Sequence, residues 1–125
     1  MNNKDEAYIK DILAMIAEIE NTVQGLRYED FMEDRTAYRA VERNFEIIGE
    51  AVKRLSPEFT KIYPEVPWKE IAGFRDILIH DYAAVNVETV WDTLEQDIPK
   101  LKTVLQKAIT EWGGDTLFLL CLFVP

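Results

Sequence analysis

The sequence has few of the residues on which metal and disulfide proteins depend. It holds one cysteine, Cys121, and one histidine, His80, among 125 residues. A single cysteine cannot form an internal disulfide, and one histidine without a cysteine cluster offers no zinc site of recognisable spacing. The carboxylates do not follow the spacing of a calcium loop either. We therefore expect no metal site and no cofactor.

Long apolar runs are also missing. The longest is the octet 117–124, whereas a helix that spans a bilayer takes about 20 apolar residues. Residues 2–6 are polar, three of them charged, and the start of the sequence lacks the basic and apolar regions of a secretory signal. These features predict a cytoplasmic protein with no membrane segment.

Basic residues are outnumbered by acidic ones, 14 against 23, and the formal net charge is −9. Lysine and arginine supply most of the affinity of indiscriminate nucleic-acid binding, so this charge disfavours it and leaves only local RNA contacts. Apolar residues make up 48% of the chain and charged residues 30%, as in folded proteins. The length suits one domain with one core.

The first half of the chain contains two segments with helical periodicity. Apolar residues recur every three or four positions from 4 to about 24, where Gly25 favours a stop. After a short acidic segment, Asp34 can cap a second helix that runs to Leu55. Gly49 in this second helix would permit a close helix crossing, and Ser56-Pro57 prevents continuation.

The second half predicts two more helices. Three prolines make 57–67 a connection with room for one helical turn, and Pro67 suits the first position of a third helix. Asn86 can cap a fourth helix, whose apolar stripe keeps its phase across Pro99, where we expect a kink. The sum is an all-α fold, an antiparallel bundle of four to five helices.

We expect this helical domain to cover residues 1–112, followed by an apolar tail over 113–125. The octet 117–124 can pack as a strand or arm, including on a second protomer. It can equally be a loose tail that promotes aggregation.

The segment 75–82 gathers the one histidine with an arginine and a tyrosine within about one and a half helical turns. Arginine suits a phosphate, and histidine transfers protons near neutral pH. Arg75 would hold a phosphate and stabilise its transition-state charge, while His80 would exchange a proton with a ribose 2′-hydroxyl or a leaving 5′-oxygen. The pattern therefore indicates phosphodiester chemistry, with Asp76, one turn before His80, orienting the imidazole.

Helix geometry limits how these groups can meet. At about 100° per residue, Arg75, Ile79 and Tyr82 lie near one face, while His80 points away from Arg75. Either the helix ends around His80, or the motifs of two chains face each other in a shared cleft of a symmetric dimer. A purely structural alternative remains, in which His80 packs at a helix end and Arg75 pairs with Asp76 or Asp81.

A basic row on the second predicted helix is a weaker candidate for RNA contacts. Arg35, Arg39 and Arg43 follow one another at four-residue spacing, and Arg39 and Arg43 are the members we consider for RNA phosphates. The glutamates among them offer a competing account, because intrahelical pairs of glutamate and arginine are common on exposed surfaces.

At these residues the sequence resembles the HepT-like toxins of the HEPN superfamily, whose mark is arginine, four residues, histidine, one residue and tyrosine. Arg75, His80 and Tyr82 match it completely. The likeness continues outside the motif and extends from about residue 4 to residue 108. Its further segments are 42–51, 66–68, 90–91 and 97–101.

The resemblance implies an HEPN-like helical fold and a homodimeric, metal-independent endoribonuclease that is the toxin of a toxin–antitoxin pair. It implies an antitoxin that is a minimal nucleotidyltransferase and silences the toxin by transferring AMP from ATP to the motif tyrosine. Arg75 and His80 then form the catalytic pair, and Tyr82 is both a site residue and the AMP acceptor. Asp76 occupies the polar position that often follows the arginine.

The leading hypothesis is RNA cleavage by the substrate's own 2′-hydroxyl, which yields a 2′,3′-cyclic phosphate. The alternative is a non-catalytic helical subunit that binds a nucleotidyltransferase, which the net acidity favours. An interaction protein that depends on the apolar octet is a third possibility.

Overall fold

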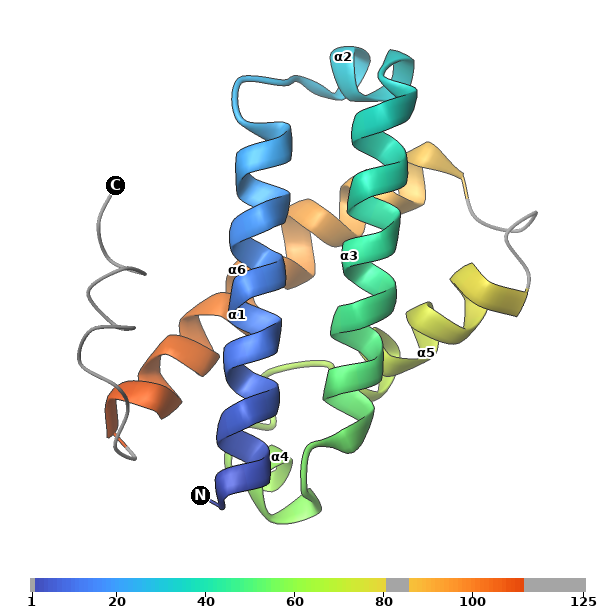
Figure 1. The fold of residues 1–125 in the computed structure, drawn as a ribbon. Coiled ribbons are helices and arrows are strands. Elements are labelled where there is room, and N and C mark those ends of the chain that lie inside the picture. The colour runs from blue at the N-terminus through green and yellow to red at the C-terminus, as the bar shows by residue number, and fades with distance from the viewer. Residues whose placement is uncertain (1, 81–85, 112–125) are drawn as a thin grey trace.

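The computed structural model describes residues 2–80 and 86–111, with only the backbone of His80 (Figure 1). Within these ranges the chain forms helices and no strand, which confirms the all-α prediction. Tyr82, Asp81 and the predicted tail 113–125 lie outside the described residues. The elements are α1 (Asn3–Val23), α2 (Tyr28–Glu33), α3 (Arg35–Arg54), α4 (Pro57–Ile62), α5 (Trp68–His80) and α6 (Val87–Glu111).

Helix α3 lies at the centre of the arrangement. It runs antiparallel beside α1 and packs against α5 on another side, while α6 crosses behind the pair and contacts α1 (Figure 1). The two short helices, α2 and α4, lie at opposite ends of α3. The four long helices are the ones that periodicity predicts.

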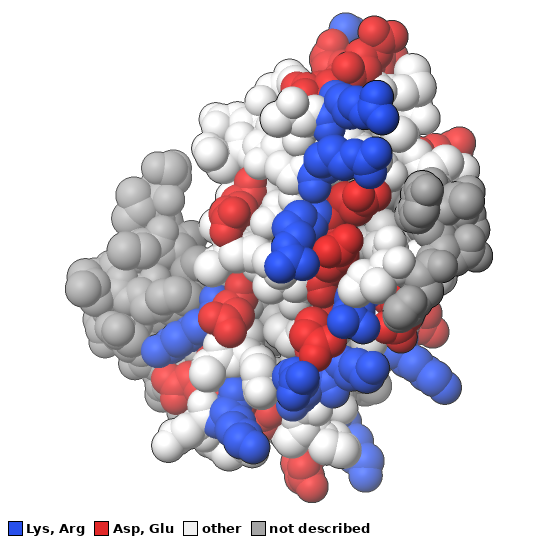
Figure 2. All heavy atoms as spheres, turned by 45° about the vertical axis from the view of Figure 1, so that its right-hand side comes forward, with Lys and Arg blue, Asp and Glu red and all other residues white. Residues whose placement is uncertain are grey.

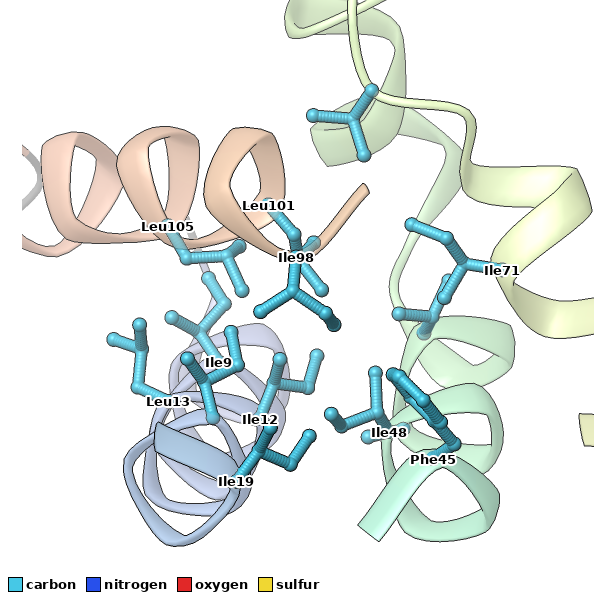
Figure 3. Packing of buried hydrophobic residues seen from close by; sticks show 14 of the residues in the cluster. Ile9, Ile12, Leu13, Ile19, Phe45, Ile48, Ile71, Ile98, Leu101 and Leu105 are labelled. Carbon is cyan, nitrogen blue, oxygen red and sulfur yellow. The ribbon is translucent and has the colours of Figure 1, made fainter. Parts of the chain in front are cut away.

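The core is mainly aliphatic, with a few buried aromatic rings such as that of Phe45, and its centre forms where α1, α3 and α6 face one another (Figure 3). Burying each large aliphatic side chain contributes about 1.5–3 kcal/mol, so the matching stripes of these helices hold the fold together. The residues that are almost completely buried include Ile9, Ile12, Leu13, Ile16, Ile19, Val41, Ile48, Val90, Leu101, Leu105 and Ile109.

The predicted starts of α3 and α6 are confirmed by capping contacts. Asp34 Oδ1 accepts a hydrogen bond from the amide of Ala37 at 3.0 Å, and Asn86 Oδ1 accepts one from Thr89 at 2.8 Å. Gly25 follows α1 with φ of +79°, a left-handed conformation that favours glycine. Helix α6 continues through Pro99, as its apolar phase predicts.

Two boundaries differ from the sequence predictions. Pro67 directly precedes α5 instead of opening it, and its carbonyl accepts the first helical hydrogen bond from Ile71 at 3.0 Å. The acidic segment before Asp34 is itself a one-turn helix, α2, in which Asp30 accepts a bond from the amide of Arg27 at 3.0 Å. Local capping therefore stabilises a turn that has too few residues for a periodic pattern.

A buried carboxylate joins the start of α1 to the segment that follows α3. Asp5, in the first turn of α1, is 3% exposed and accepts hydrogen bonds from the amide and the hydroxyl of Ser56 at 2.9 and 2.6 Å. Ser56 is also the cap of α4. This contact fixes the junction of α3 and α4 against the start of α1.

Among the described helices, none combines the length and the apolar character that crossing a bilayer requires.

Candidate active site

Arg75 lies where α5 crosses α3 at very short range. A β-carbon added to Gly49 of α3 would overlap the β-carbon of Arg75 and lie 3.2 Å from the carbonyl oxygen of Ile71. The missing side chain at Gly49 therefore lets the backbone of α5 rest directly on α3, as the sequence predicts for this glycine. The close crossing at Gly49 thus fixes where the side chain of Arg75 leaves α5.

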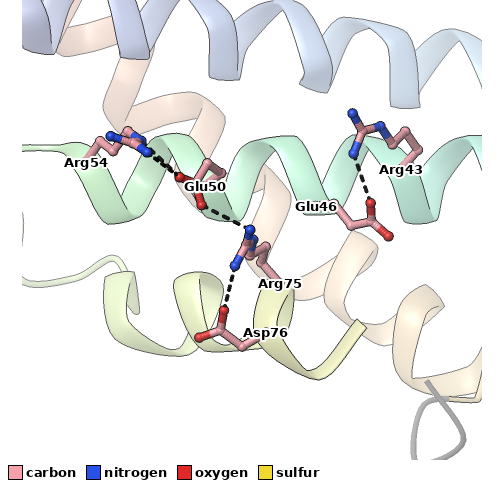
Figure 4. Close-up of polar contacts among 6 residues, drawn as sticks. All are labelled: Arg43, Glu46, Glu50, Arg54, Arg75 and Asp76. Carbon is pink, nitrogen blue, oxygen red and sulfur yellow. Dashed lines mark hydrogen bonds and ion pairs between the residues drawn. The ribbon is translucent and has the colours of Figure 1, made fainter. Parts of the chain in front are cut away.

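The guanidinium of Arg75 is held from two sides (Figure 4). Its Nη1 donates to Oδ1 of the neighbouring Asp76 at 3.0 Å, and its Nη2 forms an ion pair with Oε2 of Glu50 at 3.4 Å. The other oxygen of Glu50 accepts a bond from Arg54 at 2.9 Å, so one carboxylate joins two arginines. The hydrogen bond that Arg54 donates to Glu50 raises the pKa of the Arg54 guanidinium.

One nitrogen of Arg75 remains without a partner among the described residues. Its Nε is buried and makes no hydrogen bond there, while the side chain as a whole is 25% exposed. The guanidinium therefore reaches solvent at its tip with its stem packed between helices. A phosphate that approaches this tip would meet a cation of fixed position, because Glu50 and Asp76 restrict its rotamers.

A hollow of about 270 Å³ opens beside Arg75 between α1, α3 and α5, and we call it the Arg75 hollow. Its apolar wall includes Tyr8, Ile47 and Ile79, and its cations are Arg43, Arg54 and Arg75. Acidic side chains lie among them, namely Asp11, Glu46 and Glu50. Arg75 and Ile79 line the same hollow, which confirms that these two positions share a face of α5.

The structure tests the predicted motif only in part. Arg75 and Asp76 lie in contact, which is the pairing that the structural alternative predicts. The contact is equally compatible with a catalytic role of Arg75, because the carboxylate of Asp76 can orient the guanidinium. His80 is the last residue of α5 and its side chain is not described, so its meeting with Arg75 or Asp76 stays a prediction.

Two arginines of the basic row on α3 are paired with glutamates. Arg39 donates to Glu42 and Arg43 donates to Glu46, each at 3.1 Å and one turn along the helix. Figure 2 shows basic side chains in a line on this face with acidic side chains beside them. The pairing agrees with the solvent-exposed account of the row, and RNA contact by Arg39 and Arg43 stays a prediction.

Sequence reasoning missed the contact between Glu50 and Arg75 and the hollow itself. A signal was present in the spacing of α3, where positions 43, 46, 47, 50, 51 and 54 fall on one helical face. That face carries two of the hollow's charged pairs, but only the crossing of α5 turns it into a concave surface.

In the described part of the chain, no group of three or more histidine, cysteine, aspartate or glutamate side chains is arranged to hold a metal ion.

Comparisons with known proteins agree with the motif. A family model described as "Ribonuclease HepT-like" matches residues 12–108. A relative from Caldanaerobacter subterraneus, provisionally named an RNase, is 46% identical over 104 residues, which cover 80% of this chain and 93% of the relative. A second, from Methanocaldococcus jannaschii and also provisionally named an RNase, is 39% identical over 87% of this chain and 90% of its own.

A third relative, from Thermococcus cleftensis, is provisionally named ribonuclease HepT. It is 41% identical over 86% of this chain and 97% of its own length. No solved structure matches the chain at a significant level.

Proposed function

The chain belongs to the HepT-like ribonuclease family, and from this premise we propose that this endoribonuclease is the toxin of a toxin–antitoxin pair. The observation that carries the proposal is the placement of Arg75. The first residue of the motif stands at the rim of a surface hollow, with its guanidinium held by Glu50 and Asp76. An arginine fixed in this way suits the binding of a phosphodiester.

We assign cleavage to the 2′-hydroxyl of the substrate RNA. Its oxygen forms a bond to the adjacent phosphorus while the bond from phosphorus to the 5′-oxygen breaks, which leaves a 2′,3′-cyclic phosphate and a 5′-hydroxyl. His80 would take the proton from the 2′-hydroxyl or give one to the 5′-oxygen, since imidazole has a pKa of about 6.5. Arg75 would bind the phosphate and stabilise the charge added in the transition state. No step in this scheme requires a metal.

The proposal includes a homodimer with the two motifs facing each other. His80 follows Arg75 by five positions on α5, about 500° of rotation, so the two side chains of one straight helix diverge. A second protomer would bring its own histidine to the arginine of the first.

Silencing is assigned to Tyr82. A nucleotidyltransferase antitoxin would transfer AMP from ATP to the phenol oxygen and release pyrophosphate. The phosphate of the added AMP would place negative charge in the site where Arg75 binds the RNA phosphate. This negative charge would repel the substrate. An intact-mass measurement after co-expression with such an antitoxin tests this step. The mass should rise in steps of one AMP, and Tyr82→Phe should abolish the rise.

The decisive test of the nuclease is RNA cleavage by the purified chain in the presence of EDTA. We expect fragments that end in a 2′,3′-cyclic phosphate, and their loss in Arg75→Ala and His80→Ala at unchanged helicity. Cleavage by His80→Ala at the parent's rate would refute the mechanism.

Arg39 and Arg43 on α3 are each paired with a glutamate, which reduces their attraction for RNA. This pairing favours a second candidate, a non-catalytic subunit that binds a nucleotidyltransferase. Intact RNA together with a stable complex of the two proteins would establish it instead.

A further inference from the structure

We propose that the Arg75 hollow binds one nucleotide of the RNA, the neighbour of the scissile phosphate. The base would lie against the apolar wall, and the phosphate of that nucleotide would meet Arg43 at the rim. The inference rests on the proposed function for the position of the scissile phosphate at Arg75. It adds a subsite built from α1, α3 and the side chain of Ile79 on α5.

The size of the hollow suits a single nucleotide. Its volume of about 270 Å³ lies just below the range of about 300–1,000 Å³ found for pockets that enclose small ligands. The hollow therefore has room for one base with part of its ribose. Longer stretches of RNA would have to continue along the outer surface.

The wall offers a base an apolar surface that solvent otherwise covers. Ile79 is 41% exposed although it lines the hollow, and the half-buried Tyr8 and Ile47 extend the same wall. Bases bind such surfaces through their flat faces, and stacking on an aromatic ring like that of Tyr8 tolerates any sequence. Contact with the wall would remove this apolar area from water.

The charges of the hollow are divided in a way that orients a nucleotide. Arg43 is 69% exposed at the rim, and its ion pair with Glu46 lies at the surface, where such pairs contribute little. A phosphate can therefore replace Glu46 at low cost. Asp11 repels a phosphate from the remainder of the hollow, yet its carboxylate can accept hydrogen bonds from the amino groups of a base.

The chain provides a matched control for the cation. Arg39 and Arg43 lie on the same helix, are 56% and 69% exposed, and each pairs with a glutamate three residues later at 3.1 Å. Only Arg43 lines the hollow, so the proposal assigns the phosphate contact to Arg43 and replaces the earlier expectation of a contact at Arg39. Replacing either arginine leaves one glutamate without its ion-pair partner. The change in net charge, and its general effect on RNA binding, is therefore the same for both variants.

A second matched pair tests the apolar wall. Ile77 and Ile79 are neighbours on α5 and are 45% and 41% exposed. Only Ile79 lines the hollow. A general loss of surface hydrophobicity would affect both substitutions alike, whereas loss of a base contact would affect Ile79→Ala alone.

The experiment measures binding of a fluorescent, fully 2′-O-methylated decanucleotide of mixed sequence by anisotropy across a salt series. This probe cannot be cleaved because it has no 2′-hydroxyl. Arg43→Ala should reduce the slope of log K against log salt by about 0.7, the value for one phosphate contact in a single strand, and Arg39→Ala should leave it unchanged. Ile79→Ala should weaken binding roughly five-fold at an unchanged slope, and Ile77→Ala should not.

The proposal requires both differences. Equal slopes for Arg43→Ala and Arg39→Ala, or equal affinities for Ile79→Ala and Ile77→Ala, would overturn it. Arg43→Gln serves as the second variant if Arg43→Ala lowers the melting temperature.

Cleavage of ordinary RNA by the parent separates this failure from that of the proposed function. A parent that cuts RNA while the matched pairs behave alike leaves the nuclease intact and removes the subsite. A parent that leaves RNA intact removes the nuclease, and the binding series still decides the subsite.

Discussion

Gly49 and Arg75 touch so closely that no side chain fits between α3 and α5 at this point. A β-carbon at Gly49 would overlap that of Arg75 and lie 3.1 Å from its γ-carbon. The position of the motif arginine is therefore set by a residue 26 positions earlier in the sequence. A glycine in mid-helix costs up to about 1 kcal/mol relative to alanine, so the close crossing is maintained against helix propensity.

Gly49→Ala should consequently disturb the site. The methyl group would push α5 away from α3, and we expect the free energy of unfolding to fall by about 1–3 kcal/mol and RNA cleavage to drop by about ten-fold or more. The control is Gly73→Ala on α5, where an added β-carbon meets nothing within 4 Å. It should be neutral or stabilise the fold by up to about 1 kcal/mol. Urea denaturation measures both, and a fully active Gly49→Ala protein would contradict the crossing.

Glu50→Gln tests whether the carboxylate positions Arg75. The amide keeps the size of the side chain but loses its charge and one acceptor, so Arg75 and Arg54 would no longer share a carboxylate. We expect kcat to fall about ten-fold with little change in KM, because the loss appears when the transition-state charge develops. Glu42→Gln, whose partner Arg39 lies outside the hollow, should leave both constants unchanged. A change in KM alone would indicate a role in binding and not in positioning.

The long helices were predictable from the sequence because their stability comes from regular apolar stripes. Ile12, Ile16 and Ile19 on α1 and Leu101 and Leu105 on α6 repeat at helical spacing, and they are buried together. Caps such as Asp34 mark helix ends through local chemistry. Helix α2 could not be predicted in the same way, since one turn has no period.

The site was predictable as far as it is encoded within one helix. Arg75 and Asp76 are neighbours in the sequence, and the shared face of Arg75 and Ile79 follows from helix geometry. The pairing of Glu50 with Arg75 depends on the crossing of α3 and α5. From the sequence alone, Glu50 has an equally good partner in Arg54, four residues later, and the structure has it bind both.

Asp5→Ala should lower stability without changing the chemistry. It removes the acceptor for the amide and hydroxyl of Ser56, and a buried donor left unpaired costs about 1–3 kcal/mol. Urea denaturation should show this loss, while Glu18→Ala at an exposed position of the same helix should change the free energy of unfolding by less than about 0.5 kcal/mol. Activity per folded molecule should remain at the parent's value, and an equal stability of the two variants would contradict the role of Asp5.

Asp97 on α6 predicts a stability that depends on pH. Burial raises the pKa of its carboxyl above the ordinary value of 3.8, Lys100 lowers it, and Glu70 across the α5–α6 cavity raises it further. The folded chain therefore holds this proton to higher pH than the unfolded chain does. Because the folded state binds more protons, the contribution of Asp97 to stability falls as the pH rises from about 3.8 through the raised pKa.

Asp97→Asn removes this titration and should raise the free energy of unfolding at pH 7 relative to the parent. The advantage should shrink as the pH falls through the raised pKa and vanish below about pH 3.8, where the carboxyl is protonated in both states. Other carboxylates cancel in the difference between the two proteins, so urea denaturation at several pH values isolates Asp97. A gain for Asp97→Asn that grows toward acid would reverse the sign of the burial effect, and it would mean that Lys100 outweighs desolvation at this position.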